Sequence, residues 1–159
     1  MLIKTIKFTN FVGEEKEEKF YFNLSKVETI RLELKYPGGM MNTMMGLLGV
    51  NTKKIKDAGT NPEAIESNAD VNSDKTGKIV ELFEDIILTS YGKRSDNGDS
   101  FIKTEELKNE FKCSAAYEVL FMELLSNPVA AASFVEGIYP KMTPEEAAKL
   151  KAAEASTNN

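Results

Sequence analysis

The stretch "AAYEVLFMELL", residues 115–125, decides the fold because it is apolar almost all the way around a helix. Ser114 directly before it is a favourable N-cap, so we predict a helix over residues 115–126. A helix without a continuous polar face has to be covered by other elements of the protein. We therefore expect it to be the central buried helix.

The segments on either side of this helix are also predicted to be helical. Thr104 caps "EELKNEFK", and Asn127 with Pro128 begins "VAAASFVEGIY". Upstream, "TGKIVELFEDIILTSYG" has apolar residues at helical spacing, and we expect Gly92 to close that helix. Between them, "KRSDNGDSFI" carries an Asp-Asn-Gly turn signal and predicts a small irregular hairpin or loop. The predicted core consists of Phe83, Ile86, Ile87, Leu120, Leu124, Phe134 and Ile138.

The N-terminal segment has the alternation of a β-hairpin. "LIKTIKFTNF" and "EEKFYFNL" flank a turn containing Gly13, which places strands at about residues 2–10 and 17–23. A lone hairpin is marginal in water, so its apolar face needs helices against it. The fold class we predict is α+β, an N-terminal β-hairpin packed on a mainly α-helical bundle.

A short helix and a methionine-rich stretch follow the hairpin. Ser25 with Glu28 forms a capping box for a helix over about 26–35, with Val27, Ile30 and Leu34 on one face. Tyr36-Pro37 ends it, and "GGMMNTMMGLLGV", residues 38–50, then holds four of the seven methionines in the chain.

Two interpretations of the methionine-rich stretch remain open, a short core helix or a conditionally ordered contact surface. Methionine is flexible and adapts to irregular surfaces, whereas a core that needs one fixed packing favours Leu or Ile. Our hypothesis is the contact surface. The predicted partner-binding residues are Met40, Met41, Met44, Met45, Leu47 and Leu48.

The domain organisation follows from changes in composition. We expect residues 1–140 to form a single domain. Residues 51–77 are rich in Asn, Asp, Lys, Gly and Ser, and we interpret them as a mobile polar excursion. Thr143-Pro144 begins a last helix that has little apolar surface to bury, so residues 141–159 are predicted to be a flexible, partly helical tail.

Composition excludes several classes of function. The net charge of −5 lacks the basic excess of a nucleic-acid binder, and no apolar run approaches the length of a membrane span. With no histidine, there is no catalytic triad and no imidazole metal ligand. We expect no catalytic residues, no cofactor and no metal site. The single cysteine, Cys113, is interpreted as a half-buried small hydrophobe in a cytoplasmic protein.

Two long blocks of the sequence resemble a known family. "IKFTNFVGEEKEEKFYFNLSKVE" lies in the first block, and "DIILTSYG", "FIKTEEL", "AYEVLFMEL" and "FVEGIYP" lie in the second. Over about residues 3–40 and 80–140, the chain resembles the tail assembly chaperones of long-tailed, siphovirus-type phages and prophages of Gram-positive bacteria. Residues 38–50 and 51–77 depart from that pattern.

The resemblance implies a role without catalysis. Such chaperones bind and solubilise the hydrophobic tape-measure protein, help to recruit tail-tube subunits, and are absent from the mature virion. The implied partners are the tape-measure protein, the tail-tube protein and other copies of this chain in weak, head-to-tail contacts. The implied location is the host cytoplasm. From charge and hydropathy, we expect no nucleic acid and no membrane as a partner. The alternative is a structural tail-completion or connector protein.

Overall fold

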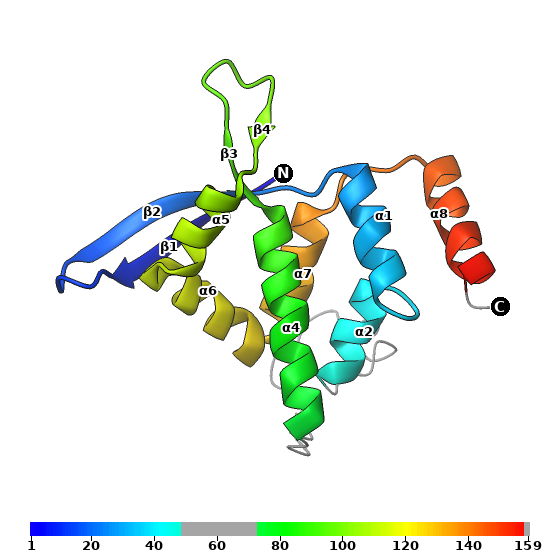
Figure 1. The fold of residues 1–159 in the computed structure, drawn as a ribbon, viewed down its shortest axis with the longest axis horizontal. Helices are drawn as coiled ribbons and strands as arrows, with labels where there is room; N and C mark the ends of the chain where they lie inside the picture. Colours follow the sequence, from blue (N-terminus) through cyan, green and yellow to red (C-terminus); the bar gives the residue numbers. More distant parts are fainter. Residues whose placement is uncertain (49–72, 158–159) are drawn as a thin grey trace. The chain divides into compact units, whose positions relative to one another are not determined.

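The computed structural model describes residues 1–48 and 73–157, and the chain divides into two compact units. The first unit comprises Met1–Thr29 and Phe83–Lys141, and the second comprises Ile30–Leu82 and Met142–Asn159. An N-terminal antiparallel hairpin is followed mainly by helices (Figure 1). The predicted α+β class is therefore confirmed.

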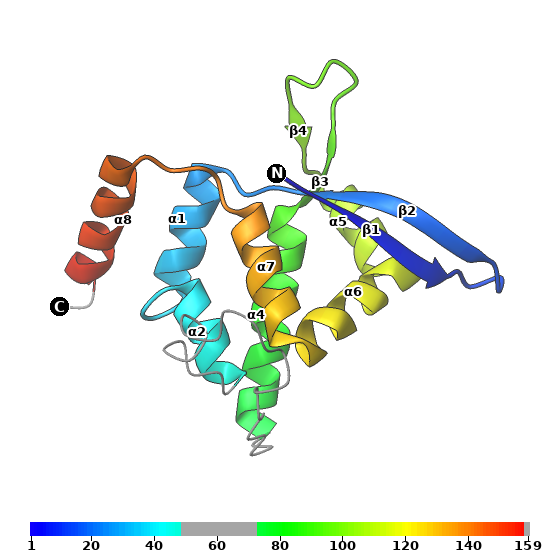
Figure 2. The ribbon, with the colours of Figure 1, turned by 180° about the vertical axis from the view of Figure 1, so that it is seen from behind.

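The N-terminal hairpin consists of β1 (Leu2–Thr9) and β2 (Glu15–Phe22), paired antiparallel along their whole length (Figure 2). Gly13 has φ +86° in the turn, a conformation that favours glycine. The side-chain oxygen of Asn10 accepts hydrogen bonds from two main-chain N–H groups of the turn. The predicted hairpin is confirmed, with strand bounds that differ by one or two residues.

A second, smaller hairpin extends the sheet to four strands in the order β1-β2-β3-β4. Its strands are β3 (Tyr91–Arg94) and β4 (Phe101–Ile102), so the turn predicted between residues 93 and 102 is confirmed. The expectation that Gly92 closes a helix is wrong, because Gly92 lies within β3. A Cβ atom there would lie 2.6 Å from the carbonyl oxygen of Ile102. Glycine is required because β4 approaches closely.

Three helices follow β4, and each begins at the predicted N-cap. The hydroxyl groups of Thr104 and Ser114 and the amide oxygen of Asn127 accept hydrogen bonds from main-chain N–H groups in the first turns. Such caps satisfy N–H groups that have no partner within the helix. The three helices are α5 (Glu105–Lys112), α6 (Ala115–Ser126) and α7 (Pro128–Ile138).

The core of the first unit joins the hairpin to these helices. All seven predicted core residues are buried, from Phe83 to Ile138. Phe22 of β2 packs edge-on against Phe134 of α7, with 5.1 Å between ring centroids. The predicted buried helix α6 contributes Leu120 and Leu124 to this core, but Val119 is 40% and Met122 58% exposed. The described elements cover only one side of this helix.

Two longer segments begin in one unit and end in the other, α1 (Lys26–Lys35) and α4 (Ser73–Ser90). The predicted capping box at the start of α1 is confirmed. The Glu28 N–H donates to Ser25 Oγ at 3.2 Å, and the Ser25 N–H donates to Glu28 Oε2 at 2.8 Å. The predicted excursion over 51–77 falls mostly outside the described residues, and its last five residues belong to α4.

The second unit contains α2 (Met40–Leu47) and α8 (Pro144–Thr157). Gly38 and Gly39 have positive φ angles between α1 and α2, which explains the glycine pair. The side chain of Glu146 accepts a hydrogen bond from the Thr143 N–H at the start of α8. The predicted helical part of the tail is present, and its predicted flexibility stays a prediction.

Candidate functional site

The methionine-rich segment forms a regular helix, α2, in which the predicted partner-binding residues have two different environments. Met40 and Met44 are fully buried and Met45 is 3% exposed. Met41, Leu47 and Leu48 are half-buried. The main-chain N–H of Met40 donates to the Glu33 carboxylate at 2.8 Å, which fixes the start of the helix to α1.

This arrangement divides the six predicted residues. The three buried methionines have the environment that the core-helix interpretation requires. A partner could reach Met41, Leu47 and Leu48 without unfolding α2, because each keeps part of its surface exposed. Binding of a partner by the six residues stays a prediction.

An apolar stripe along α1 is exposed. Val27, Ile30 and Leu34 lie at helical spacing on one face and are 58%, 39% and 47% exposed. The sequence correctly placed these residues together. Helical spacing does not indicate which face of the helix is buried, and in the structure Thr29 and Leu32 are buried instead of this stripe. An exposed stripe at positions i, i+3 and i+7 is the pattern by which helices dock against other helices.

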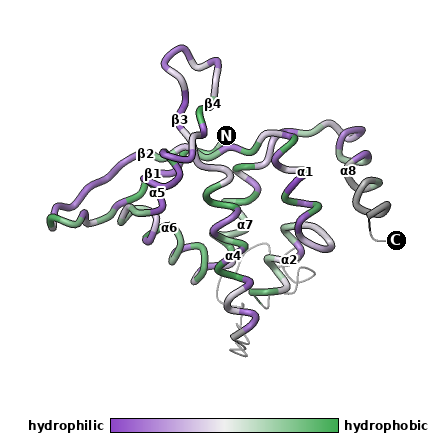
Figure 3. The backbone as a smooth tube through the Cα atoms, in the orientation of Figure 1, coloured by the Kyte–Doolittle hydropathy of each residue, from purple (hydrophilic) through white to green (hydrophobic). Residues whose placement is uncertain are grey.

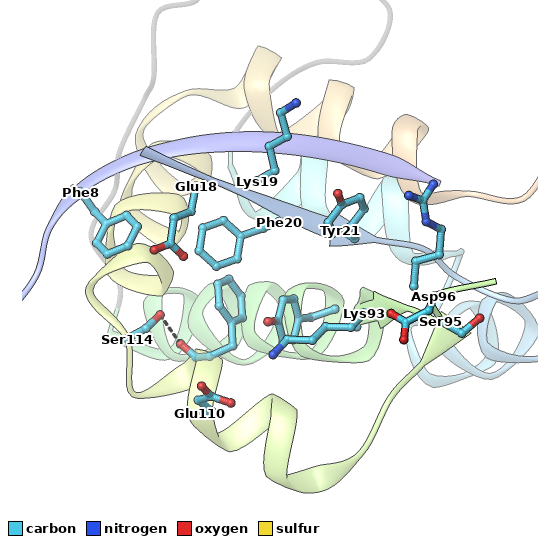
Figure 4. A pocket seen from close by; sticks show the side chains of 14 residues that line it. Phe8, Glu18, Lys19, Phe20, Tyr21, Lys93, Ser95, Asp96, Glu110 and Ser114 are labelled. Carbon is cyan, nitrogen blue, oxygen red and sulfur yellow. Dashed lines mark hydrogen bonds between the residues drawn. The ribbon is translucent and has the colours of Figure 1, made fainter. Parts of the chain in front are cut away.

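A cleft of about 520 Å³ opens in the first unit beside the N-terminal hairpin. Figure 4 shows Phe8 and Phe20 of the hairpin on one side and Glu110 and Ser114 on the other. The ring of Phe111 stacks on Tyr91 at the base, with 4.1 Å between centroids. The cleft therefore has an aromatic floor and a charged rim. No local sequence pattern predicts the cleft, because its lining residues come from distant segments.

The rim of the cleft carries both signs of charge. Glu18 and Glu110 contribute carboxylates, and Lys19, Lys93 and Arg94 contribute cations. Burial raises the pKa of the Tyr91 hydroxyl, and the negative charges of Glu110 and Glu18 raise it further. The tyrosine is therefore neutral at physiological pH. The cleft therefore offers both apolar and charged contacts.

One partly buried cation ties three segments of the first unit together. Lys103 Nζ donates hydrogen bonds to Glu28 Oε2 at 2.6 Å, to the Asn23 carbonyl at 2.7 Å and to the Thr89 carbonyl at 2.8 Å. Burial raises the pKa of Glu28, but the hydrogen bonds from Lys103 and Ser25 outweigh this effect, and the pKa lies below its ordinary value of 4.5. Because all three partners of Lys103 belong to the fold itself, this group is structural.

No group of three or more Asp, Glu or Cys side chains within residues 1–48 and 73–157 could hold a metal ion. Cys113 is exposed, so the expectation that it is half-buried is wrong, and the chain has no histidine to activate its thiol. Burial raises the pKa of Tyr117 to about 12, which leaves it protonated at neutral pH.

No single helix in the described ranges is long and apolar enough to cross a membrane. Helices α6 and α7 reach the required length and hydropathy only together, and the chain bends by 115° between them. Both helices contribute several buried side chains to the core of the first unit.

Three features of the described residues expose apolar or aromatic groups: the stripe on α1, the helix α2 and the cleft beside the hairpin. A search of curated proteins and a search of solved structures each gave no match. The sequence model of the phage tail assembly chaperone family matches residues 1–159, the whole length of the chain, and the protein belongs to that family.

Proposed function

We propose that this chaperone binds the tape-measure protein of a siphovirus-type phage or prophage of a Gram-positive bacterium and keeps it soluble in the host cytoplasm. It then helps to recruit tail-tube subunits and is absent from the mature virion. It acts by binding alone, without catalysis. Membership of the tail assembly chaperone family supports this role.

The exposed stripe on α1 is the observation that carries client binding. The side chains of Val27, Ile30 and Leu34 form an exposed apolar strip at helical spacing, and exposed apolar strips can serve as protein-interaction sites. A tape-measure protein with long amphipathic helices would present matching strips. The half-buried residues Met41, Leu47 and Leu48 of α2 offer further adaptable contacts.

Co-expression with the tape-measure protein of the same phage tests this role. The wild-type chain should keep the client soluble and co-purify with it. The double variant Ile30→Ser, Leu34→Ser should recover much less client. Its melting temperature should change little, because both side chains are already exposed. The matched control is the double variant Val119→Ser, Met122→Ser, because these two side chains are similarly exposed on α6. Equal client recovery with both double variants would contradict a role for α1.

A second double variant examines α2 in the same assay. Met41→Ser with Leu48→Ser changes two half-buried residues and leaves Met40, Met44 and Met45 in place. Loss of client recovery with a retained melting temperature would support the predicted contact surface. Loss of both together would assign the helix to the core.

Mass spectrometry distinguishes this role from that of a structural tail-completion or connector protein. The chaperone should be abundant in lysates of infected cells and missing from purified particles. A fixed number of copies in every particle would favour the structural alternative. Self-association, which we propose to be weak and head-to-tail, would let many copies cover one long client.

A further inference from the structure

β2 has one edge paired with β1 and an outer edge on the opposite side. Among the described residues, strand pairing on the outer edge covers only two residues of β2. β3 pairs with Tyr21 and Phe22 of β2 and then turns away to pair with β4. The Asn23 N–H continues this contact by donating to the Ser90 carbonyl at 2.7 Å. From Glu15 to Phe20, the described residues provide no second strand on this side.

The main-chain groups of this open edge belong to alternate residues. In antiparallel sheets, every second residue directs its N–H and C=O toward the same neighbouring strand. Because Asn23 uses this edge, the groups of Glu15, Glu17 and Lys19 also point outward. They can form hydrogen bonds to a further strand, and the cleft lies at the Lys19 end of this edge (Figure 4).

The side chains along the open edge are all charged, in the order Glu-Lys-Glu-Glu-Lys from residue 15 to residue 19. Lys7 of β1 pairs with the central Glu17 at 3.1 Å. Each of the other four residues lies opposite an uncharged residue of β1 and forms no ion pair with any residue that the structure describes. The opposed pairs are Glu15 with Thr9, Lys16 with Phe8, Glu18 with Ile6, and Lys19 with Thr5.

We propose that this edge pairs antiparallel with the same edge of a second copy of the chain, centred on Glu17. The inference rests on the proposed self-association of the chain, and the contact that it specifies is symmetric and separate from the head-to-tail contact. In this register each uncompensated charge meets an opposite charge on the second copy, and such cross-strand pairs stabilise a sheet. The pairs are Glu15 with Lys19, Lys16 with Glu18, Glu18 with Lys16, and Lys19 with Glu15.

Charge and backbone geometry exclude the neighbouring registers. A shift of one residue would set outward-directed main-chain groups against inward-directed ones. A shift of two residues in one direction places Glu15 opposite Glu17 and Lys16 opposite itself. The same shift in the other direction places Glu15 opposite Tyr21, whose outer edge is already paired with Gly92. Charges on a strand edge normally prevent pairing, but this pattern permits one register.

The two remaining features of the hairpin also fit this register. The central contact brings two Glu17 residues together, and the Lys7 partner of each offsets their repulsion. At the hairpin tip, Phe11 and Val12 are 80% and 79% exposed. Figure 3 shows this hydrophobic tip beyond the hydrophilic part of the hairpin. In the proposed pairing the tip extends past Lys19 of the second copy, toward its aromatic cleft.

Charge-reversal variants test the pairing in solution. One variant carries Lys16→Glu with Lys19→Glu, and the other carries Glu15→Lys with Glu18→Lys. The wild type should form a dimer in sedimentation experiments. Each variant alone should dimerise at least about tenfold more weakly, because four attractive pairs become repulsive. An equimolar mixture should recover a heterodimer, since the charges are then again opposite. A monomeric wild type, unaltered variant dimers, or an unrescued mixture of folded variants would each overturn the proposal.

A cysteine cross-link provides an independent test that does not alter these four charges. Glu17→Cys, combined with Cys113→Ser to remove the exposed native thiol, should form a disulfide-linked dimer on mild oxidation. Directly opposed, hydrogen-bonded residues lie about 5.5 Å apart at Cα, which a disulfide can span. Thr5→Cys in the same background is the matched control on β1 and should stay largely unlinked. Equal cross-linking at both positions would overturn the register.

The client assay separates failure of this inference from failure of the proposed function. If the wild type does not dimerise but still co-purifies with the tape-measure protein, the pairing is wrong and client binding stands. If the charge-reversed mixture recovers a heterodimer but no variant or wild type binds the client, the pairing stands and the proposed function fails. Binding of an extended tape-measure segment to the β2 edge of a monomer would also overturn the pairing.

Discussion

Leu124 shows what one core residue contributes to this fold. It is fully buried in α6, and it is one of the residues that helical periodicity placed in the core. We expect Leu124→Ala to lower the free energy of unfolding by about 2–5 kcal/mol, because the truncation leaves a cavity. Denaturant unfolding of the two proteins measures this difference.

The control for this substitution lies on the same helix. Met122 is 58% exposed, so Met122→Ala should change the free energy of unfolding by no more than about 0.5 kcal/mol. A loss below about 1 kcal/mol for Leu124→Ala would show that α6 is not packed as the structure has it.

Glu28 provides a pH-dependent contribution to stability. Its pKa is below the ordinary 4.5 in the folded chain, so the unfolded chain binds more protons as the pH falls through that range. Its stabilising effect is complete above pH 4.5 and disappears as the pH falls through the lower, folded-state pKa. Glu28→Gln should therefore be less stable than the wild type at neutral pH, and this difference should shrink in acid.

Unfolding curves of both proteins at several pH values measure the effect. Lys7 forms an exposed ion pair with Glu17, so Glu17→Gln is the control and should cause little change in stability at neutral pH. A difference between wild type and Glu28→Gln that is independent of pH would show that the Lys103 pair does not form.

At the scale of a secondary-structure element, α2 combines core and surface roles in eight residues. Met44→Ala should cost about 2–5 kcal/mol, because the side chain has no exposed surface. Met41→Ala, one turn away and half-buried, should cost clearly less. Thermal and denaturant unfolding compare the two. Equal losses would mean that Met41 is buried as completely as Met44, and the partner-binding hypothesis for Met41 would lose its structural basis.

The elements also show how far local signals reach. The predicted helix caps are present at Ser25, Thr104, Ser114 and Asn127. A cap needs only hydrogen bonds between near neighbours, so a local sequence pattern is enough to predict it. Gly92 was misinterpreted because a glycine after an apolar helix is a common stop signal. Its actual requirement is contact with β4, ten residues later, which no local pattern encodes.

At the scale of the whole molecule, the proposed β2 contact and the proposed head-to-tail contact have different consequences. A symmetric pairing closes at two copies, whereas a head-to-tail contact can continue. If both exist, light scattering across a concentration series should show masses that keep rising beyond a dimer. The variant with Lys16→Glu and Lys19→Glu should still grow, through the head-to-tail surface alone. A mass that stops at two copies would leave only the β2 contact.

Sequence alone determined the α+β class, the N-terminal hairpin, most helix bounds and the seven core residues. These features rest on periodicity, turn residues and caps, which act over a few neighbouring residues. It also identified the family and the apolar spacing of Val27, Ile30 and Leu34 on α1.

Tertiary structure decided which apolar surfaces are buried and which remain available. Three methionines of α2 are buried, while the stripe on α1 and Met122 of α6 are exposed, although all of these side chains are apolar. The aromatic cleft and the open edge of β2 likewise depend on where β3 separates from β2. Burial and strand pairing depend on residues far apart in the chain, so their outcome is set by the packing of the whole fold and not by local pattern.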